Sequence, residues 1–478
     1  MSTEEWIDAW LLRGQVMGDE AAWQEAETWA AEIESMGRWT DLANAYRKLD
    51  LFERARHAFK AAMRSAEPAS RGYAYLNYAN FLLQQGEHRE ALAIFELAWE
   101  IQSEPEVGLS FSSALLETKD DGRALSFLLT ESKCLASLAG YWSNLAIAFT
   151  RAGSYEEARS AAAKAFELEP SRDNCFQHSL AELRATGVAA KGAWRNFESR
   201  PKRPEYEDSF GEELKSVESL KAGDRVVVFC EQGIGDILQF IRFADELEAA
   251  GARVVIAGAP RLEPLITHSF PSFSYVRNPS EALRVRPKYW VPLLSLPLVL
   301  RLQNPGAPRK AYLVPPYREN QTEGESRNKR IGVAWRGNPA YPNDHLRSAS
   351  LADFGALLDG DTFDVFSLLI APDEELKGFN LRRLPDGVDE SGIFTDTASL
   401  VADLDAVVST DTSVAHLSAA LGVPTYLLLN RGADWRWGSP ARPVSWYESM
   451  NLVWLDDAGF SGGVKRIASR IFSDSARS

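Results

Sequence analysis

The chain has 478 residues, of which 45% are apolar and 25% are charged. This composition is ordinary for globular proteins, so it excludes a largely disordered chain and predicts about two to four packed domains. The 67 acidic residues outnumber the 52 basic ones, and the net charge of −15 argues against bulk electrostatic binding of nucleic acid or anionic lipid.

The sequence predicts neither export nor membrane insertion. The first ten residues carry three acidic and no basic side chains, the opposite of a secretory signal. The longest nearly apolar run, Trp290 to Leu300, contains two prolines and is shorter than the roughly 20 residues that span a bilayer. Cys134, Cys175 and Cys230 lack metal-type spacing, so we expect buried thiols and a soluble, cytoplasmic protein.

One pattern recurs in the first third of the chain. Large apolar residues and alanines follow one another at spacings of three and four, and each series ends at a proline. The copies run from Trp39 to Pro68, from Tyr75 to Pro105 and from Trp142 to Pro170, and segment 109–128 fits as a weaker copy. Such spacings place the large side chains on one helix face, while alanines let two helices pack closely. We therefore expect a series of helical hairpins.

These copies resemble the tetratricopeptide repeat, a 34-residue helix-turn-helix unit that stacks into a superhelix with a concave binding face. The resemblance covers residues 36–170, and Trp6 to Met36 is helix-like enough for a partial repeat or a cap. We expect the array to bind a peptide or protein, with a dimerisation or spacer role as the alternative. Residues 1–200 are assigned to this all-α domain and residues 201–224 to a linker.

The second half alternates short apolar strands with helical stretches. One series of strands is expected at 225–230, 254–257 and 289–294, and another at 331–335, 365–369, 406–409, 425–429 and 452–455. Buried strands joined by helices form parallel sheets, so the two series predict two doubly wound α/β lobes, 225–325 and 326–478. Ligands bind such lobes where strand carboxyl ends meet helix N-termini, which directs attention to a few loops.

The loop after the first of these strands contains Gly233, Gly235 and Asp236. Glycines let the backbone approach a phosphate or a sugar, and the start of the following helix favours an anion. A dinucleotide fingerprint would have a third glycine where Leu238 stands, which weakens the case for a nicotinamide cofactor. Asp236 has two roles open to it, helix cap and catalytic base.

Two loops of the second series carry further candidates. The loop after 331–335 contains Arg336 and Arg347, each either a partner for a diphosphate leaving group or a solvated surface arginine. The strand 406–409 is followed by a helix start rich in hydroxyls and free amides, at Asp411, Thr412 and Ser413, which suits a phosphate. A plain helix cap is the other explanation for Asp411.

Beyond these loops, the sequence leaves two assignments open and disfavours a metal. His416 lies one turn into the helix and either faces the cleft or is a core histidine with satisfied hydrogen bonds. The aromatic segment around Trp435 could stack on a base or sugar ring, or serve packing. The Asp403 and Asp405 pair precedes its strand, on the wrong side for a metal-bound donor, so no metal site is expected.

Three strings carry a family resemblance over residues 224–460. FCEQGIGDILQFIRF, AWRGNPAYPNDHLRS and VVSTDTSVAHLSAALGVPTYLLL, with DWRW after the last, resemble glycosyltransferase family 9, the ADP-heptose heptosyltransferases of lipopolysaccharide assembly. The resemblance implies a GT-B fold with the acceptor in the first lobe and the nucleotide sugar in the second, no essential metal, and inversion at the anomeric carbon. Repeats joined to such a domain are similar to the O-linked N-acetylglucosamine transferases and to bacterial enzymes that glycosylate flagellin or adhesins.

The same resemblance assigns roles to individual residues. Asp236 takes the place of the family's catalytic aspartate, and Arg347 that of its phosphate-binding lysine, which keeps the charge but changes the geometry. Ser413 stands where the family's Asp-Thr-Gly turn has glycine, and His416 matches the histidine of that helix. The expected donor-binding residues are Gly233, Gly235, Trp335, Arg336, Gly337, Asn338, Arg347, Asp411, Thr412, Ser413, His416 and Trp435.

The expected activity is inverting, metal-independent transfer of a sugar from a nucleotide-sugar donor to a hydroxyl of a protein held by the repeats. Flagellin or another surface protein is a candidate acceptor. We expect no cofactor besides the donor and no nucleic-acid partner. Two alternatives stay open: a non-catalytic scaffold with a degenerate transferase domain, and a transferase that acts on a lipid-linked or saccharide acceptor.

Overall fold

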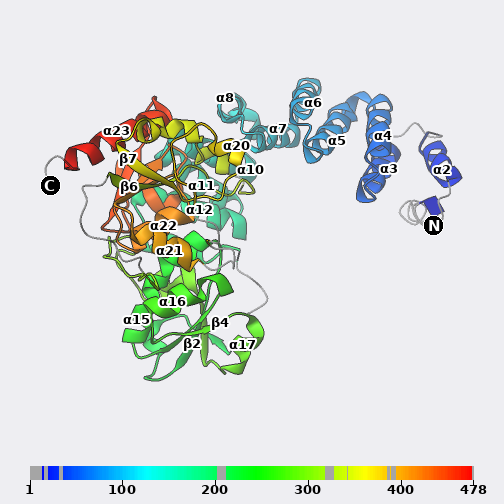
Figure 1. Cartoon of the computed structure of the whole chain (residues 1–478). Coiled ribbons are helices and arrows are strands. Elements are labelled where there is room, and N and C mark those ends of the chain that lie inside the picture. Colours follow the sequence, from blue (N-terminus) through cyan, green and yellow to red (C-terminus); the bar gives the residue numbers. More distant parts are fainter. Residues whose placement is uncertain are drawn as a thin grey trace. The chain divides into compact units, whose positions relative to one another are not determined.

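The chain is described by a computed structural model. The described residues are 13–14, 20–31, 36–201, 211–317, 328–341, 343–384, 388 and 394–475. The chain divides into two compact units (Figure 1): unit 1 comprises Met1–Phe149 and Ser160–Glu169, and unit 2 comprises Thr150–Arg159 and Pro170–Ser478. This division lies upstream of the boundary near residue 200 that we placed from the sequence, because the helices after Pro170 share their core with the sheets.

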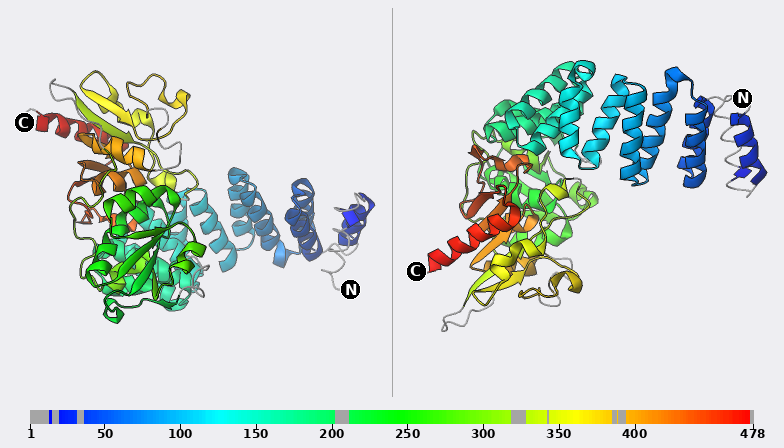
Figure 2. Two further views of the ribbon diagram at one scale, coloured as in Figure 1. Left: turned by 60° about the horizontal axis from the view of Figure 1, so that its bottom comes forward. Right: turned by 90° about the horizontal axis from the view of Figure 1, so that it is seen from above.

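Unit 1 contains a series of antiparallel helices, which Figure 2 shows one after another along the array. They are α2 (Glu20–Ala31), α3 (Met36–Lys48), α4 (Phe52–Arg64), α5 (Arg71–Gln84), α6 (His88–Ile101), α7 (Pro105–Glu117), α8 (Asp121–Thr130), α9 (Ser132–Leu135), α10 (Ala139–Ala152) and α11 (Tyr155–Leu168). The last two cross the boundary between the units. The predicted copies coincide with α3–α4, α5–α6 and α10–α11, and the weaker copy with α7–α8.

Small residues let these helices approach one another, as the sequence predicts. Ala79, Ala91 and Ala98 are fully buried, and they lie on α5 and α6 beside the buried ring of Phe95. Of the stretch from Trp6 to Met36, α2 is helical, and residues 6–12, 15–19 and 32–35 lie outside the described residues. No helix in the described part of the chain is both long and apolar enough to cross a membrane.

Unit 2 begins with helical segments and continues with a five-stranded sheet, all of whose strands are parallel. The strands are β1 (Glu212–Glu213), β2 (Arg225–Phe229), β3 (Arg253–Ala257), β4 (Ser274–Val276) and β5 (Tyr289–Pro292), in the order β1-β5-β2-β3-β4. The helices of this part are α12 (Arg172–Thr186), α13 (Lys191–Phe197), α14 (Ile234–Phe240), α15 (Ala244–Ala249), α16 (Glu263–Ser269), α17 (Pro279–Arg284) and α18 (Leu296–Val299). Where the sequence predicts one helix over 237–250, a 3₁₀ turn at Ile241–Phe243 separates α14 from α15.

A second parallel sheet follows, in the order β12-β9-β8-β6-β7. Its strands are β6 (Lys329–Ala334), β7 (Phe363–Ser367), β8 (Ala406–Ser409), β9 (Thr425–Leu429) and β12 (Met450–Trp454). Its helices are α19 (Gly355–Leu358), α20 (Asp373–Leu376), α21 (Thr395–Ala402), α22 (Ser413–Ala420) and α23 (Gly459–Ser475). A short antiparallel hairpin, β10 (Gly438–Ser439) and β11 (Arg442–Pro443), lies between β9 and β12.

The strand orders identify where a ligand would bind. In the first sheet β3 and β5 lie on opposite sides of β2, and in the second β7 and β8 lie on opposite sides of β6. Doubly wound sheets bind ligands at such switch points, beyond the carboxyl ends of the strands. The loops after β2, β6 and β8, which carry most of the residues singled out from the sequence, therefore lie at the switch points of the two sheets.

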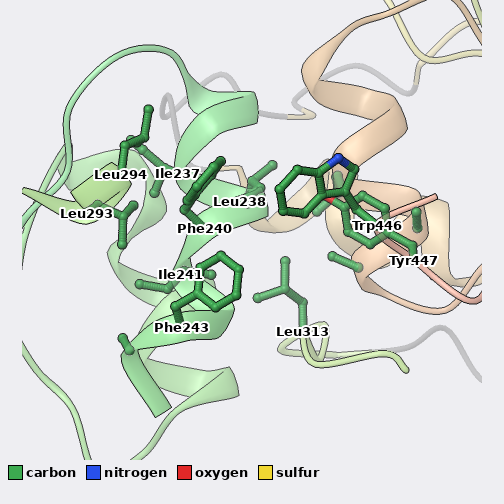
Figure 3. Close-up of a cluster of buried hydrophobic side chains, with 14 of the residues drawn as sticks. Ile237, Leu238, Phe240, Ile241, Phe243, Leu293, Leu294, Leu313, Trp446 and Tyr447 are labelled. Atoms are coloured by element: carbon green, nitrogen blue, oxygen red, sulfur yellow. The ribbon is translucent and has the colours of Figure 1, made fainter. Parts of the chain in front are cut away.

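The two sheets of unit 2 share one hydrophobic core. Figure 3 shows Phe240 of α14 between Leu293, which follows β5, and Trp446, which lies between β11 and β12. The ring of Phe240 is 5.7 Å from that of Trp446. The packing of α14 thus fixes the loop that precedes it. Of the three free cysteines only Cys230 is buried; Cys134 and Cys175 are partly exposed, which corrects our expectation of three buried thiols.

Candidate functional site

Asp236 lies in the first turn of α14, and each of its two carboxylate oxygens has a different partner. One carboxylate oxygen, Oδ2, accepts a hydrogen bond of 2.8 Å from the backbone N–H of Gly233, the N-cap residue. The other, Oδ1, forms an ion pair with Arg436, which follows β9. The helix-cap role that the sequence left open is thus present, and each oxygen keeps a second lone pair that can accept a proton.

Arg436 connects the loop after β2 with the loop after β9. Its Nη1 donates to Oδ1 of Asp434 at 2.6 Å, and its Nε donates to Gln239 of α14 at 2.9 Å. Burial lowers the pKa of Arg436 to about 10, so the guanidinium is charged at neutral pH. Its charge keeps the Asp236 carboxylate in place between the two loops.

The start of α22 leaves backbone donors free of side-chain caps. The N-cap residue is Thr412, whose side chain forms no cap hydrogen bond and instead pairs with Ser409 at 3.0 Å. Asp411 lies before the cap position, so the plain-cap explanation for this aspartate does not hold. Uncapped N–H groups at a helix start favour an anion, and a phosphate could accept from them.

Arg347 lies beside this helix start. Its Nη1 donates to the backbone oxygen of Asp411 at 2.9 Å, and its Nε donates to Asp344 at 3.0 Å. Gly337 packs against the same pair, since a Cβ there would lie 2.5 Å from Nη2 of Arg347. A glycine at 337 therefore leaves room for this guanidinium beside the loop after β8.

A pair of carboxylates, Asp411 and Asp434, lies at the centre of these contacts. Burial and the neighbouring charge of Asp434 raise the pKa of Asp411 to about 7, and Arg347 acts against the rise. The pKa of Asp434 is raised too, by burial, while the hydrogen bond from the backbone N–H of Arg436 and then the charges of Arg184 and Arg347 act against that rise. The charge of Asp434 therefore disfavours ionisation of Asp411.

His416 is a buried, neutral side chain. Its Nδ1 lies 2.8 Å from the hydroxyl of Tyr447, and its ring stacks on Trp437 with the centroids 5.3 Å apart. Burial and then the charge of Arg242 lower its pKa to about 3. The ring also meets the first loop: a Cβ on Gly235 would lie 2.9 Å from its Cδ2. The structure therefore favours the core histidine and shows why position 235 is glycine.

Other donor-binding candidates lie away from this centre or inside the core. Trp335 is fully buried and donates its indole N–H to Glu375 at 2.6 Å. Arg336 pairs with the same carboxylate at 2.9 Å, and its side chain is 33% exposed, so it is a partly exposed arginine that already has a partner within the chain. Trp435 is buried against Trp194, with ring centroids 5.7 Å apart, so it is not exposed for stacking.

Asn338 is exposed, and its side chain accepts from the N–H of Ala340 within the loop after β6. Asp403 and Asp405 lie before β8, where Asp405 accepts from the N–H of Arg330. The described residues include no group of three or more His, Cys, Asp or Glu side chains that could hold a metal ion. The contacts therefore gather Asp236, Arg347, Asp411, Thr412 and Ser413 with the two glycines at 233 and 235.

The sequence analysis missed four charged side chains of the site. They are Arg184, Asp344, Asp434 and Arg436. The segment Asp434–Trp437 was noticed for its aromatic rings, although the arginine between the two tryptophans holds Asp236. The alternation of charged and aromatic residues after a buried strand was a usable signal for Arg436, but nothing local indicates Arg184.

Comparison with known proteins identifies the repeats. The family model of the tetratricopeptide repeat matches residues 72–105. Protein FlbA of Caulobacter vibrioides is 24% identical over 411 residues, which cover 78% of this chain and 68% of FlbA. YrrB, a TPR protein with an unusual peptide-binding site, matches at 16% identity over 37% of this chain and 92% of its own, with a TM-score of 0.30. Yeast Tom70 matches at 16% identity over 40% of this chain and 42% of its own, with a TM-score of 0.32.

Proposed function

We propose that unit 2 is a metal-independent, inverting glycosyltransferase of the GT-B type that transfers a sugar from a nucleotide sugar to a hydroxyl. The carrying observation is that the loop after β2, which holds Asp236, packs against the uncapped start of α22 in the second sheet: a Cβ on Gly235 would lie 3.7 Å from the Cα of Ser413. We infer that the Asp236 carboxylate and the start of α22 act on the same bound donor, which is what displacement of a nucleoside diphosphate requires.

The proposed reaction assigns a separate task to each of these two parts. Asp236 accepts the proton of the acceptor hydroxyl, whose oxygen attacks the anomeric carbon from the face opposite the nucleotide. As the bond to the diphosphate breaks, its negative charge is stabilised by the amides at the start of α22 and by Arg347. Arg347 supplies a fixed cation there, so the reaction as proposed needs no divalent ion.

Arg436 has a positioning task in this scheme. Its ion pair holds Oδ1 of Asp236, while the Gly233 N–H holds Oδ2, so the carboxylate cannot rotate freely. Positioning of a general base within hydrogen-bond reach of its hydroxyl is the first requirement for proton transfer.

The array is proposed to hold a protein acceptor. Tetratricopeptide repeats bind peptides or proteins in their concave face, and the match at residues 72–105 identifies such repeats here. A surface protein such as flagellin is the candidate class that the resemblance suggests. An acceptor that is a saccharide or is linked to a lipid would use the same transferase site without the array.

A non-catalytic scaffold is the second candidate, and one observation favours it. Asp236 and Arg347 are each bound by residues of the chain itself, by Arg436 and by Asp344. A donor would have to bind without losing these contacts or displace part of them. A thermal-shift screen with nucleotides and nucleotide sugars separates the two functions, because a scaffold with a degenerate site gains no stability from any of them.

The proposal is tested by incubating the chain with a panel of nucleotide sugars and candidate acceptor proteins from the same cell, followed by intact-mass measurement. Asp236→Asn should lower transfer by about 10²–10⁴-fold while nucleotide binding persists, because only proton acceptance is lost. Asp245→Asn, an exposed carboxylate on α15, is the matched control. A near-normal rate in Asp236→Asn would remove Asp236 from this role.

A further inference from the structure

Three of the four loops of the candidate site, those after β2, β6 and β9, are contacted by helical residues that precede the first sheet. These residues, 150–159 and 171–201, belong to unit 2, and we call them the helical brace. The brace comprises the end of α10, the start of α11, and α12 and α13 with the turn after them. Its contacts with the sheets' loops join residues that are far apart in the sequence.

The strongest contacts are with the loop after β9, which carries Asp434 and Arg436. The Tyr155 hydroxyl donates to the backbone oxygen of Arg431 at 2.5 Å. Arg184 donates twice to the backbone oxygen of Ala433, from Nε at 3.1 Å and from Nη2 at 2.8 Å. Two side chains of the brace therefore hold the carbonyls just before Asp434.

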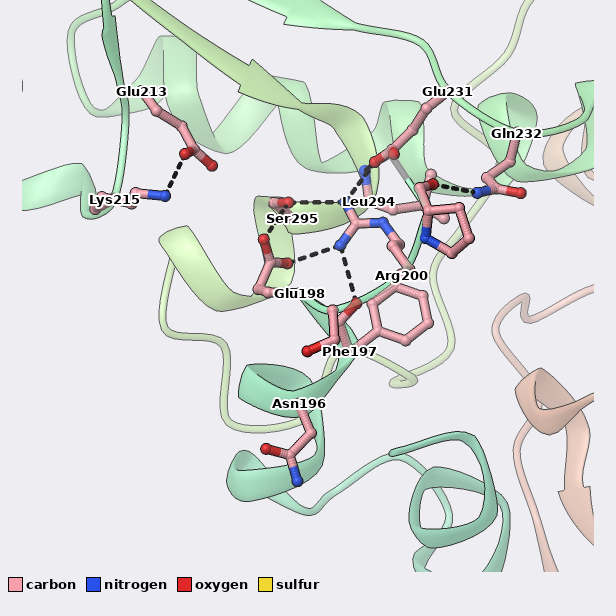
Figure 4. A network of polar contacts seen from close by, with 12 residues as sticks. Asn196, Phe197, Glu198, Arg200, Glu213, Lys215, Glu231, Gln232, Leu294 and Ser295 are labelled. Carbon is pink, nitrogen blue, oxygen red and sulfur yellow. Dashed lines mark hydrogen bonds and ion pairs between the residues drawn. The ribbon is translucent and has the colours of Figure 1, made fainter. Parts of the chain in front are cut away.

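The other two loops are held in the same way. In the loop after β6, Asn343 accepts from Nη2 of Arg151 at 3.1 Å, one residue before the Asp344 that pairs with Arg347. In the loop after β2, Glu231 forms a buried ion pair with Arg200, whose Nη2 also donates to Ser295 at 2.8 Å (Figure 4). Glu231 lies five residues before Asp236, so this pair fixes the approach to α14.

The brace also sets the charge balance of the site. Asp434 faces Arg184 from α12, Arg347, Arg436, the Asp411 carboxylate and Tyr341. Burial lowers the pKa of Arg184, and the charge of Asp434 is the largest influence that opposes this effect. The guanidinium of Arg184 is thus a counter-charge for the carboxylate pair as well as a hydrogen-bond donor.

We propose that the helical brace is a working part of the α/β site, with Arg184 as a positioning residue that holds the loop after β9 and places a cation near Asp434. The consequences for sugar transfer rest on the proposed function; the consequences for loop order and charge do not.

The test compares three substitutions at Arg184 in the full chain. Arg184→Ala removes both the hydrogen bonds and the charge, Arg184→Gln keeps a donor without the charge, and Arg184→Lys keeps the charge with a donor. Arg195→Ala is the matched control, because Arg195 is an exposed arginine of the same brace. Each variant is studied by amide hydrogen exchange and by urea unfolding between pH 5 and 9.

In Arg184→Ala we expect amides of residues 430–437 to exchange roughly tenfold faster, since a charged hydrogen-bond donor to this loop is lost. Exchange in β2 and β3 should not change. Arg184→Gln and Arg184→Lys should both recover most of the protection. Unchanged exchange at 430–437 in Arg184→Ala would overturn the positioning role.

The pH measurement separates the charge from the hydrogen bonds. Without a cation at 184, the carboxylate pair should keep its proton up to a higher pH. In Arg184→Gln and Arg184→Ala, the free energy of unfolding should therefore continue to fall at pH values where that of the wild type is already level. Arg184→Lys should behave like the wild type. Identical pH profiles for the Gln and Lys variants would contradict the charge role. If these effects appear while the wild-type chain binds no nucleotide sugar, the proposed function fails and the positioning role stands.

Discussion

The helical array and the α/β unit are stabilised by different kinds of contact. In the array, pairs such as α3–α4 and α5–α6 pack on their neighbours through alanines and single aromatic rings. In unit 2, fully buried arginines hold loops together across the chain: Arg242 reaches the carbonyl of Trp446, 204 residues away. Local packing can be altered at one place with local effects, whereas a buried long-range charge affects every loop it joins.

The largest expected effect is in the Arg200 network. Arg200→Ala leaves Glu231 buried without its cation, which should lower the free energy of unfolding of unit 2 by about 5 kcal/mol. Hydrogen exchange of β2 amides in the full chain measures the loss. The double variant Arg200→Met with Glu231→Leu should recover most of it, because the buried carboxylate is removed with its cation, while the partly exposed Glu198, which also pairs with Arg200, still accepts from Ser295. If Arg200→Ala lowers the free energy of unfolding by less than about 1 kcal/mol, the Arg200–Glu231 pair contributes no more than an exposed surface pair.

The matching change in the array is Phe95→Ala. Phe95 is buried and stacks near Phe111 at 6.3 Å, so the cavity should cost about 3 kcal/mol. We expect faster amide exchange in the neighbouring helices α5 to α8, since repeats contact only their neighbours. The exchange rates in the two sheets should not change. Leu97→Ala, at a site that is 42% exposed, is the control. Faster exchange throughout unit 2 would break the contrast between the two regions.

The carboxylate pair should give unit 2 a pH dependence that the array lacks. The pKa of Asp411 is raised to about 7 in the folded chain, so the folded state holds a proton that the unfolded state loses near pH 4. The stability that this proton provides is complete below pH 4 and is lost as the pH rises to about 7. As the pH rises through this range, the free energy of unfolding of Asp411→Asn should therefore increase relative to that of the wild type by up to about 1.4 kcal/mol per pH unit.

Urea midpoints of the two proteins between pH 4 and 8 measure this difference. Neutral His416, whose pKa is lowered to about 3, has the opposite slope between pH 3 and 6.5 in both proteins and cancels in the comparison. Parallel midpoints for the wild type and Asp411→Asn over the whole range would contradict the raised pKa.

The smallest effect is expected for an ion pair on the array surface. Arg123 pairs with Glu96 at 3.3 Å, and the two side chains are 48% and 53% exposed. Arg123→Ala should change the free energy of unfolding by less than about 0.5 kcal/mol, because solvent and salt screen the pair. Chemical denaturation at two salt concentrations checks this expectation, and a loss of several kcal/mol would mean that array charges matter as much as buried ones.

The fold was largely predictable because its signals are local. Spacings of three and four predict the repeat helices, and short apolar runs predict β2, β3 and β5 of the first sheet and all five strands of the second. The strand β4 (Ser274–Val276) was missed because three residues carry almost no pattern. The strand β1 was missed because it is two glutamates, Glu212 and Glu213, paired at the sheet edge by their backbone.

The candidate site was predictable only in part. Loops after buried strands indicate Asp236, Arg347 and the start of α22, since doubly wound sheets bind ligands there. Arg436 and Arg184 were not found because their partners lie 200 and 249 residues away in the sequence. The sequence predicts donor contacts for Trp335 and Trp435 because it shows aromatic character but not burial, and both side chains are buried.

The division of the chain inside α10 and α11 limits how this architecture can be lengthened or exchanged. Residues 150–159 of this hairpin belong with the sheets, and its remaining parts belong with the array. A chimera that takes its array from another protein should therefore be joined before Ala139, with the whole hairpin kept from the sheet-bearing parent. Duplication or loss of repeats is expected to be tolerated only upstream of that junction.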